Sequence, residues 1–234
     1  MRTKTWLPLT LKEVFSLTGR PSARLVTSPD DLREALVIAL RNYEAELHGA
    51  QNPVRRLWDR QGGGNTFRPI EEDGLSDDVK LFLERELVTN AIIANREVEI
   101  SRVPGAPVGQ RTDIRINALR RSEDGTAFDV ITAVIETKGC WNKELFTALE
   151  AQLYRAYMVR LQAPVGIYLV GWFDKPKWDP KDDRRRRTPN CTLLDAQMRL
   201  DAQAQAIPAG FSVQALVLDC HAPRLDTEKG SRRA

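Results

Sequence analysis

The sequence predicts an α/β fold in which a mixed central sheet is flanked by helices, and the order of its hydrophobic patterns carries that prediction. A helix pattern comes first, followed by three strand patterns, a long helix and an apolar strand: 75–88, 96–102, 111–119, 128–137, 142–161 and 165–173. This order is typical of such a sheet: a helix, a three-stranded meander, a second helix and a further strand. One more helix and strand extend it.

The first elements are predicted from residue spacing and turn residues. The apolar side chains of the first helix recur at helical spacing and form one stripe: Leu75, Val79, Phe82, Leu83 and Leu87. Pro104-Gly-Ala-Pro and Ser122-Glu-Asp-Gly separate the three strands and favour turns. These segments therefore form a helix followed by a meander.

The remaining elements follow the meander. Asn142 can cap the long helix, and the continuous apolar run at 165–173 is typical of a strand buried on both faces. A helix near 193–206 and a strand at 212–218 complete the domain.

Residues 1–68 are predicted to form a mostly helical accessory region. Ser28 supplies an N-cap, Pro29 lies in the first turn, and apolar residues then follow in a helical pattern to about Leu47. Gln61-Gly-Gly-Gly-Asn has the composition of a flexible linker, so we place the domain boundary there.

Composition limits the class of protein. With 42% hydrophobic residues among 234, the chain can build one sizeable core plus an appendage, so we expect a main domain at 69–220 and a polar tail at 221–234. No stretch reaches the roughly 18 apolar residues of a membrane-spanning helix, and we expect a soluble, cytoplasmic protein with no membrane contact. Three scattered cysteines and two histidines give little support to disulfides, a zinc site or a histidine-based mechanism.

The residues that point to chemistry lie at the end of the third strand. Glu136 and Lys138 follow a continuous apolar run and share one face of the strand, about 6 to 7 Å apart along it. On the preceding strand Asp113 points opposite to Ile114 and Ile116, and in a hairpin it lies beside Glu136.

Two acids and one amine in a common pocket suit metal-dependent hydrolysis of a phosphodiester. Mg²⁺ prefers one or two carboxylates and keeps several waters, and Mn²⁺ is expected to substitute for it. Asp113 and Glu136 would bind the ion together with the main-chain carbonyl of Thr137, and Lys138 would orient the attacking water or stabilise hydroxide. A solvated charge pair that simply ends a strand is the alternative.

The chain resembles the PD-(D/E)XK nuclease superfamily in two respects. Asp113 is followed, after 22 intervening residues, by Glu136-Thr-Lys138, and the predicted elements come in the order described above. The resemblance covers about 69–220, with Thr112 in the place of the proline. It implies a restriction-endonuclease-like αβββαβ core and a metal-dependent DNA endonuclease of bacterial genome defence or DNA processing. It also makes a homodimer, or association with a larger defence protein, plausible.

The resemblance further implies two helix-borne site residues. Family members often add a glutamate from the first helix, which favours Glu72, although Glu86 lies near the same apolar stripe and competes. Gln152 interrupts the apolar face of the helix after the motif, where some branches carry a glutamine with a tyrosine four residues later. Here Tyr154 and Tyr157 follow at two and five residues, so Gln152 either contacts the active site or DNA, or serves as a buried hydrogen-bonding group.

Arg184, Arg185, Arg186 and Arg187 form one dense cationic run in a segment predicted as a loop. The run is either a solvated loop or a phosphate contact to nucleic acid. No phosphate-binding loop for a nucleotide cofactor occurs, since Gly62-Gly-Gly64 lacks the lysine and the helix that such a loop requires. The alternative function is a catalytically inactive module that keeps the fold and binds nucleic acid or a protein partner, or a structural domain of a larger assembly.

Overall fold

The computed structural model describes residues 26–61, 66–87, 92–101, 110–121 and 128–222. In chain order the elements are α2 (Pro29–Leu47), the 3-10 helix η2 (Pro53–Leu57), β1 (Trp58–Gln61), β2 (Thr66–Pro69), α3 (Glu72–Leu87), β3 (Ile92–Ser101), β4 (Gln110–Arg121), β5 (Phe128–Gly139), the π-helix η4 (Leu149–Met158), α4 (Val159–Leu161), β6 (Val165–Trp172), α5 (Asp183–Arg187), α6 (Leu193–Gln205) and β7 (Ser212–Asp219). The two predicted turns, the three glycines of the linker and most of the tail lie outside these ranges. None of the described helices is long and apolar enough to cross a membrane.

The central sheet is mixed, as predicted. Its five strands lie in the order β3-β4-β5-β6-β7. The pairs β3–β4 and β4–β5 are antiparallel, whereas β5–β6 and β6–β7 are parallel. The predicted order of elements along the main domain is therefore confirmed, and β6 is buried along its whole length.

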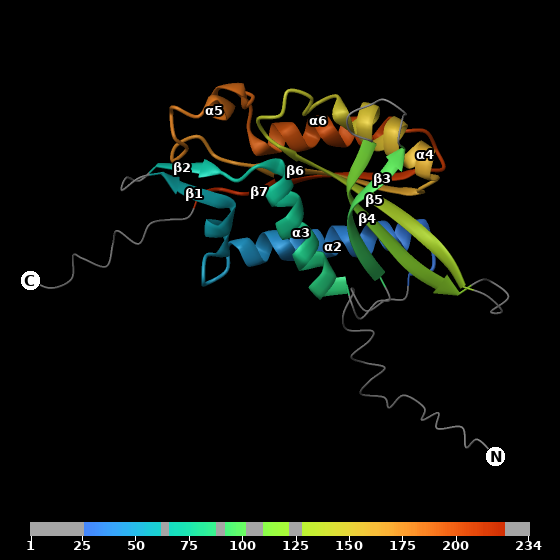
Figure 1. The fold of residues 1–234 in the computed structure, drawn as a ribbon. Helices are drawn as coiled ribbons and strands as arrows, with labels where there is room; N and C mark the ends of the chain where they lie inside the picture. The colour runs from blue at the N-terminus through green and yellow to red at the C-terminus, as the bar shows by residue number, and fades with distance from the viewer. Residues whose placement is uncertain (1–25, 62–65, 88–91, 102–109, 122–127, 223–234) are drawn as a thin grey trace, which may run out of the picture.

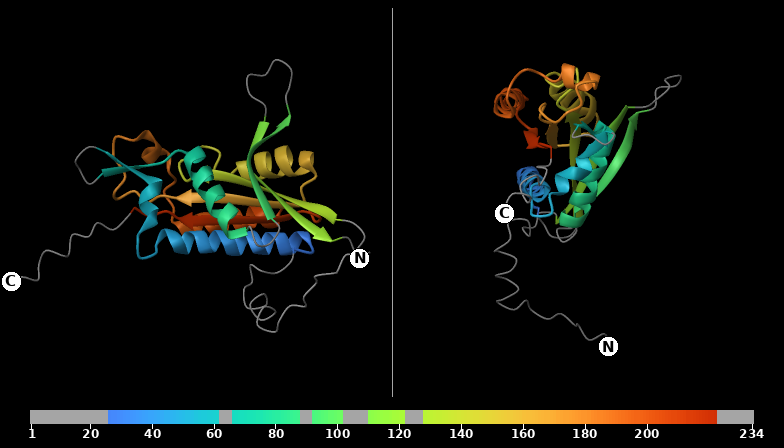
Figure 2. Two further views of the ribbon diagram at one scale, coloured as in Figure 1. Left: turned by 60° about the horizontal axis from the view of Figure 1, so that its bottom comes forward. Right: turned by 90° about the vertical axis from the view of Figure 1, so that its left-hand side faces the viewer.

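Helices cover both faces of this sheet. Figures 1 and 2 show α2 and α3 on one face and α4 and α6 on the other. The apolar stripe predicted for the first helix is buried in α3, from Leu75 to Leu87. The fold is thus an α/β structure whose sheet lies between two helical layers.

The described part of residues 1–68 packs onto the sheet. Ser28 caps α2 through the Asp31 main-chain N–H, and the Asp31 carboxylate accepts from the Ser28 N–H, which together make a capping box. Buried residues of α2 belong to the same hydrophobic cluster as those of β5, β6 and β7. Strands β1 and β2 pair with each other, so the glycine-rich segment joins two paired strands.

The prediction for the helix after the third strand is wrong in two respects. Residues 143–147 form turns and the helix begins near Ala148. Asn142 therefore lies too early in the chain to cap it. Its first ten residues, Leu149–Met158, are a π-helix in which the Val159 N–H donates to the Tyr154 carbonyl, five residues earlier. Residues five apart therefore lie about one turn apart on this helix.

The open edge of β7 is covered by side chains from both helical layers. Gln197 of α6 accepts from the Val217 N–H at 2.7 Å and donates to the Ala215 carbonyl at 3.0 Å. Glu44 of α2 accepts from the Asp219 N–H at 2.6 Å, and the His48 ring donates to the Asp219 carbonyl. Main-chain groups that an edge strand normally leaves free are therefore occupied.

Candidate active site

The hairpin β4–β5 brings the predicted acids together. Its pairing places Ile114 opposite Ile135, so Asp113 and Glu136 are the next residues along the two strands. The Asp113 carboxylate accepts a hydrogen bond of 2.7 Å from the Thr137 main-chain N–H. The neighbourhood predicted from alternation along the two strands is therefore present.

Glu136 and Lys138 form a buried ion pair at the end of β5. The Lys138 Nζ donates to the Glu136 Oε1 at 2.6 Å, and the residues are only 2% and 8% exposed. The other carboxylate oxygen, Oε2, is buried and has no hydrogen-bond partner among the described residues. A charged oxygen in that position favours a further cationic or donating group.

Glu72 is the helix-borne acid that reaches this cluster. It is the first residue of α3, and its Oε1 accepts from the Gly139 main-chain N–H at 3.0 Å. The Asn142 side-chain amide donates to both Glu72 oxygens, at 2.8 and 3.0 Å. Glu86 instead accepts from Asn42 of α2 and faces away from the site.

Burial and mutual repulsion raise the pKa values of the acids. The pKa of Glu136 is raised to about 8, mainly by burial and then by the Asp113 charge, although Lys138 opposes this. Burial also raises the pKa of Asp113, against the lowering effects of the Thr137 N–H and Lys138. For Lys138, burial lowers the pKa, but the neighbouring carboxylates, Glu136 first, outweigh it and raise the pKa overall. Perturbed groups of this kind concentrate at functional sites.

Gln152 and Tyr157 lie on the helix that packs beside the site. The Gln152 amide donates to Glu144, and it forms no hydrogen bond with the three predicted catalytic side chains. Tyr157 is buried, and after burial the charges of Glu136 and Asp113 are the largest causes that raise its pKa. The π-helical winding brings the spacing of five between Gln152 and Tyr157 close to one turn.

The arginine run forms the short helix α5, which corrects the predicted loop. Arg184 is held inside the protein, since it donates to Asp182 and Glu71 and lies 5.0 Å from the centre of the Trp141 ring. Arg185 donates to the Lys175 carbonyl, and Arg186 pairs with Asp183. Arg187 is exposed and has no hydrogen bond or ion pair with the described residues. The four arginines are therefore not equivalent.

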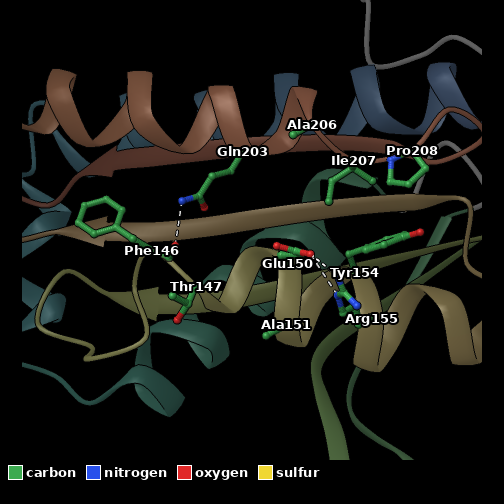
Figure 3. A pocket seen from close by; sticks show the side chains of 10 residues that line it. All are labelled: Phe146, Thr147, Glu150, Ala151, Tyr154, Arg155, Gln203, Ala206, Ile207 and Pro208. Atoms are coloured by element: carbon green, nitrogen blue, oxygen red, sulfur yellow. Dashed lines mark hydrogen bonds and ion pairs between the residues drawn. The ribbon is translucent and has the colours of Figure 1, made fainter.

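A cavity of about 710 Å³ lies between η4 and α6 (Figure 3). Phe146, Tyr154 and Ile207 give it an apolar lining, and Arg155 pairs with Glu150 at its rim. None of the predicted site residues lines this cavity. The predicted catalytic residues therefore lie elsewhere, in the group formed by Glu72, Asp113, Glu136 and Lys138, which we call the acidic cluster.

Comparisons with known proteins do not assign the chain to a class. No protein-family model, no curated protein and no solved structure matches it. Within the described ranges, no group of three or more His, Cys, Asp or Glu side chains is arranged to hold a metal ion. The set of two carboxylates and one main-chain carbonyl expected here is smaller than such a group.

Sequence reasoning missed Asn142 as a site residue. We expect Asn142→Ala to lower the free energy of unfolding by about 2 kcal/mol, because the charged Glu72 loses two hydrogen bonds and the Glu144 N–H loses one. Urea denaturation measures the change, and Asn190→Ala on an exposed loop is the matched control. Equal stability of the two variants would show that Asn142 does not hold Glu72.

Proposed function

We propose that the chain is a Mg²⁺-dependent endonuclease that hydrolyses phosphodiester bonds in DNA and has a restriction-endonuclease-like core. The observation that carries the proposal is the end of β5, where Glu136 lies buried beside Asp113 and Lys138, and where one of its oxygens has no hydrogen-bond partner among the described residues. The order of elements and the mixed sheet support the choice of core. Genome defence or DNA processing in the cytoplasm is the setting that we propose.

The donor set fits Mg²⁺. One or two carboxylates suffice for this ion, which otherwise keeps water ligands. Asp113 and Glu136 would hold it with the Thr137 carbonyl, and the partnerless Glu136 oxygen is the group that such an ion would satisfy. Glu72, fixed by Gly139 and Asn142, adds negative charge at the rim of the cluster.

The bound ion would supply positive charge for the phosphate and favour ionisation of a water molecule. Lys138 would orient that water through its ammonium group and stabilise the negative charge that develops as the water gives its proton to the solvent. The water oxygen would bond to phosphorus while the bond to the leaving oxygen breaks, and the leaving oxygen would take up a proton from the solvent. Asp113 and Glu136 would hold the ion as carboxylates, so the reaction would need Glu136 without its proton.

Plasmid cleavage with Mg²⁺ or Mn²⁺ tests the proposal. Wild type is expected to nick and linearise the plasmid, and Asp113→Asn to lower the rate by about 10²- to 10³-fold, as expected for loss of a charge-stabilising group. Asp129→Asn is the matched control, because Asp129 is an exposed aspartate of the same hairpin. An inactive wild type that still binds DNA would support the alternative, a non-catalytic nucleic-acid-binding module.

A further inference from the structure

A cavity of about 620 Å³ opens beside Glu72, and we call it the Glu72 cavity. Its walls come from the start of α3, the turn after β5 and the helix α5. Glu72 belongs both to this cavity and to the acidic cluster, and its charge acts on Asp113 and Glu136. The cavity therefore adjoins the acidic cluster at Glu72.

The acids that line the Glu72 cavity are already engaged. Glu71 pairs with Arg184 at 2.9 Å, and Glu144 accepts from Gln152 at 2.5 Å. Glu72 accepts from Gly139 and Asn142, and Asp73 also has a partner. Glu71 is thus paired with a cation, whereas Glu72 and Glu144 are held by uncharged donors, which leave their charge in place.

Two cations of the same wall are not engaged. Lys143, in the turn after β5, and Arg187, at the end of α5, are both exposed and line the cavity. Neither forms a hydrogen bond or an ion pair with the described part of the chain, whereas the other lining cation, Arg184, is fully used. Beside its carboxylates the cavity thus carries two cations, on separate segments, that have no partner in the described part of the chain.

The wall between these cations is rigid. A Cβ atom on Gly139 would lie 2.4 Å from the Trp141 ring, so glycine is needed there, and Arg184 stacks on the same ring. Trp141 also packs edge-on against Trp178, at 5.6 Å between ring centres. Lys143 and Arg187 therefore flank a tightly packed wall built around Trp141.

We infer that the Glu72 cavity binds the phosphate groups of a nucleic-acid strand that flank the bond held at the acidic cluster, with Lys143 and Arg187 as the phosphate contacts. This inference rests on the proposed function. It assigns to Lys143 and Arg187 the binding that the sequence alone assigned to the whole arginine run. Arg184 instead builds the wall of the cavity.

Fluorescence anisotropy with a labelled DNA oligonucleotide tests the inference. The full chain is titrated in Ca²⁺, an oxygen-binding ion used here in place of Mg²⁺, at several salt concentrations. The double variant Lys143→Gln/Arg187→Gln is expected to reduce the slope of log affinity against log salt by about 1.4 to 1.8, as for two lost phosphate contacts. Arg33→Gln/Arg155→Gln loses the same charge at surface ion pairs outside the cavity and is expected to keep the wild-type slope.

Equal slopes for the two double variants would overturn the inference, since only overall charge would then matter. Displacement of the oligonucleotide by inorganic phosphate at equal concentration would also overturn it, because a single phosphate rather than a strand would be the ligand. Plasmid cleavage by the wild type reports separately on the proposed function. If the wild type does not cleave and the Lys143→Gln/Arg187→Gln variant has the smaller slope, the binding site is retained and the nuclease is rejected. If the wild type cleaves and the variant keeps the wild-type slope, the nuclease is retained and the binding site is rejected.

Discussion

Lys138→Met is expected to lower the rate of DNA cleavage by about 10²- to 10³-fold, the range for loss of a group that stabilises developing charge. Mn²⁺ binding is expected to stay as tight as in the wild type or to become tighter. The reason is that the Lys138 ammonium lies 2.6 Å from Glu136 Oε1 and competes with an added cation for that oxygen. We therefore measure the cleavage rate and, by calorimetric titration, the affinity for Mn²⁺. Loss of cleavage without loss of Mn²⁺ binding distinguishes the role of Lys138 from that of the carboxylates that would bind the ion.

The same variant has a cost in stability. Removing one partner of a buried ion pair costs about 3 to 5 kcal/mol when the other charge stays, and protonation of Glu136 reduces that cost. Lys138→Arg, which keeps the charge, serves as the second variant if Lys138→Met does not fold. Lys80→Met is the control, because Lys80 pairs with Glu84 on α3, away from the cluster. Wild-type cleavage by folded Lys138→Met would remove Lys138 from the mechanism.

The metal-free protein is expected to become less stable as the pH rises from about 4.5 to about 8. The pKa of Glu136 is raised from 4.5 to about 8 in the folded chain, mainly by burial. Across this window the folded state holds a proton that the unfolded state has lost, so the free energy of unfolding falls with pH, by at most about 1.4 kcal/mol per unit. This contribution is complete below 4.5 and is lost as the pH passes 8.

Glu136→Gln tests this pH dependence, because glutamine resembles the protonated acid and carries no titrating proton. Urea denaturation with a chelator is expected to give nearly equal stability at pH 5 and a more stable variant at pH 8. The exposed Glu150→Gln is expected to change neither value. In the wild type, the affinity for Mn²⁺ is expected to rise over the same window, because the ion needs ionised Glu136. Parallel pH curves for wild type and Glu136→Gln would contradict the raised pKa.

Much of the fold and the centre of the candidate site could be predicted from the sequence. Glu136 and Lys138 follow a strongly apolar strand, and alternation then fixes their common face, while Asp113 shares its strand with buried isoleucines. The choice between Glu72 and Glu86 needed coordinates. Both acids lie close to one apolar stripe, and only the position of α3 against the turn after β5 shows which one meets Gly139.

The helix after β5 shows what periodicity cannot supply. Polar residues at a helix start usually cap it, but the Asn142 amide donates to Glu72, far away in the sequence, and its oxygen accepts from the Glu144 N–H in the turns before the helix. A π-helix has no spacing signal of its own within a pattern read at the α-helical period. At the α-helical period, Tyr157 lies one residue too far from Gln152 to share its face. The π-helical winding brings these two residues, five apart in sequence, close to one turn apart.

The differences among the four arginines could not be predicted from the sequence, for a related reason. Four adjacent arginines look alike in composition, yet a helix of five residues turns them in different directions. Arg184 stacks on the Trp141 ring, while Arg187 is exposed and has no hydrogen bond or ion pair with the part of the chain that the structure describes. Partners that lie far away in sequence decide which arginine has donors left for a ligand.

The covered edge of β7 restricts how two copies of the chain can associate. Polymerisation by joining sheets requires free main-chain donors and acceptors, and Gln197 and Glu44 occupy those of Val217 and Asp219. Continuous growth of the sheet through this strand is thereby suppressed. Two subunits that cut opposite strands of a duplex are accordingly expected to meet through another surface.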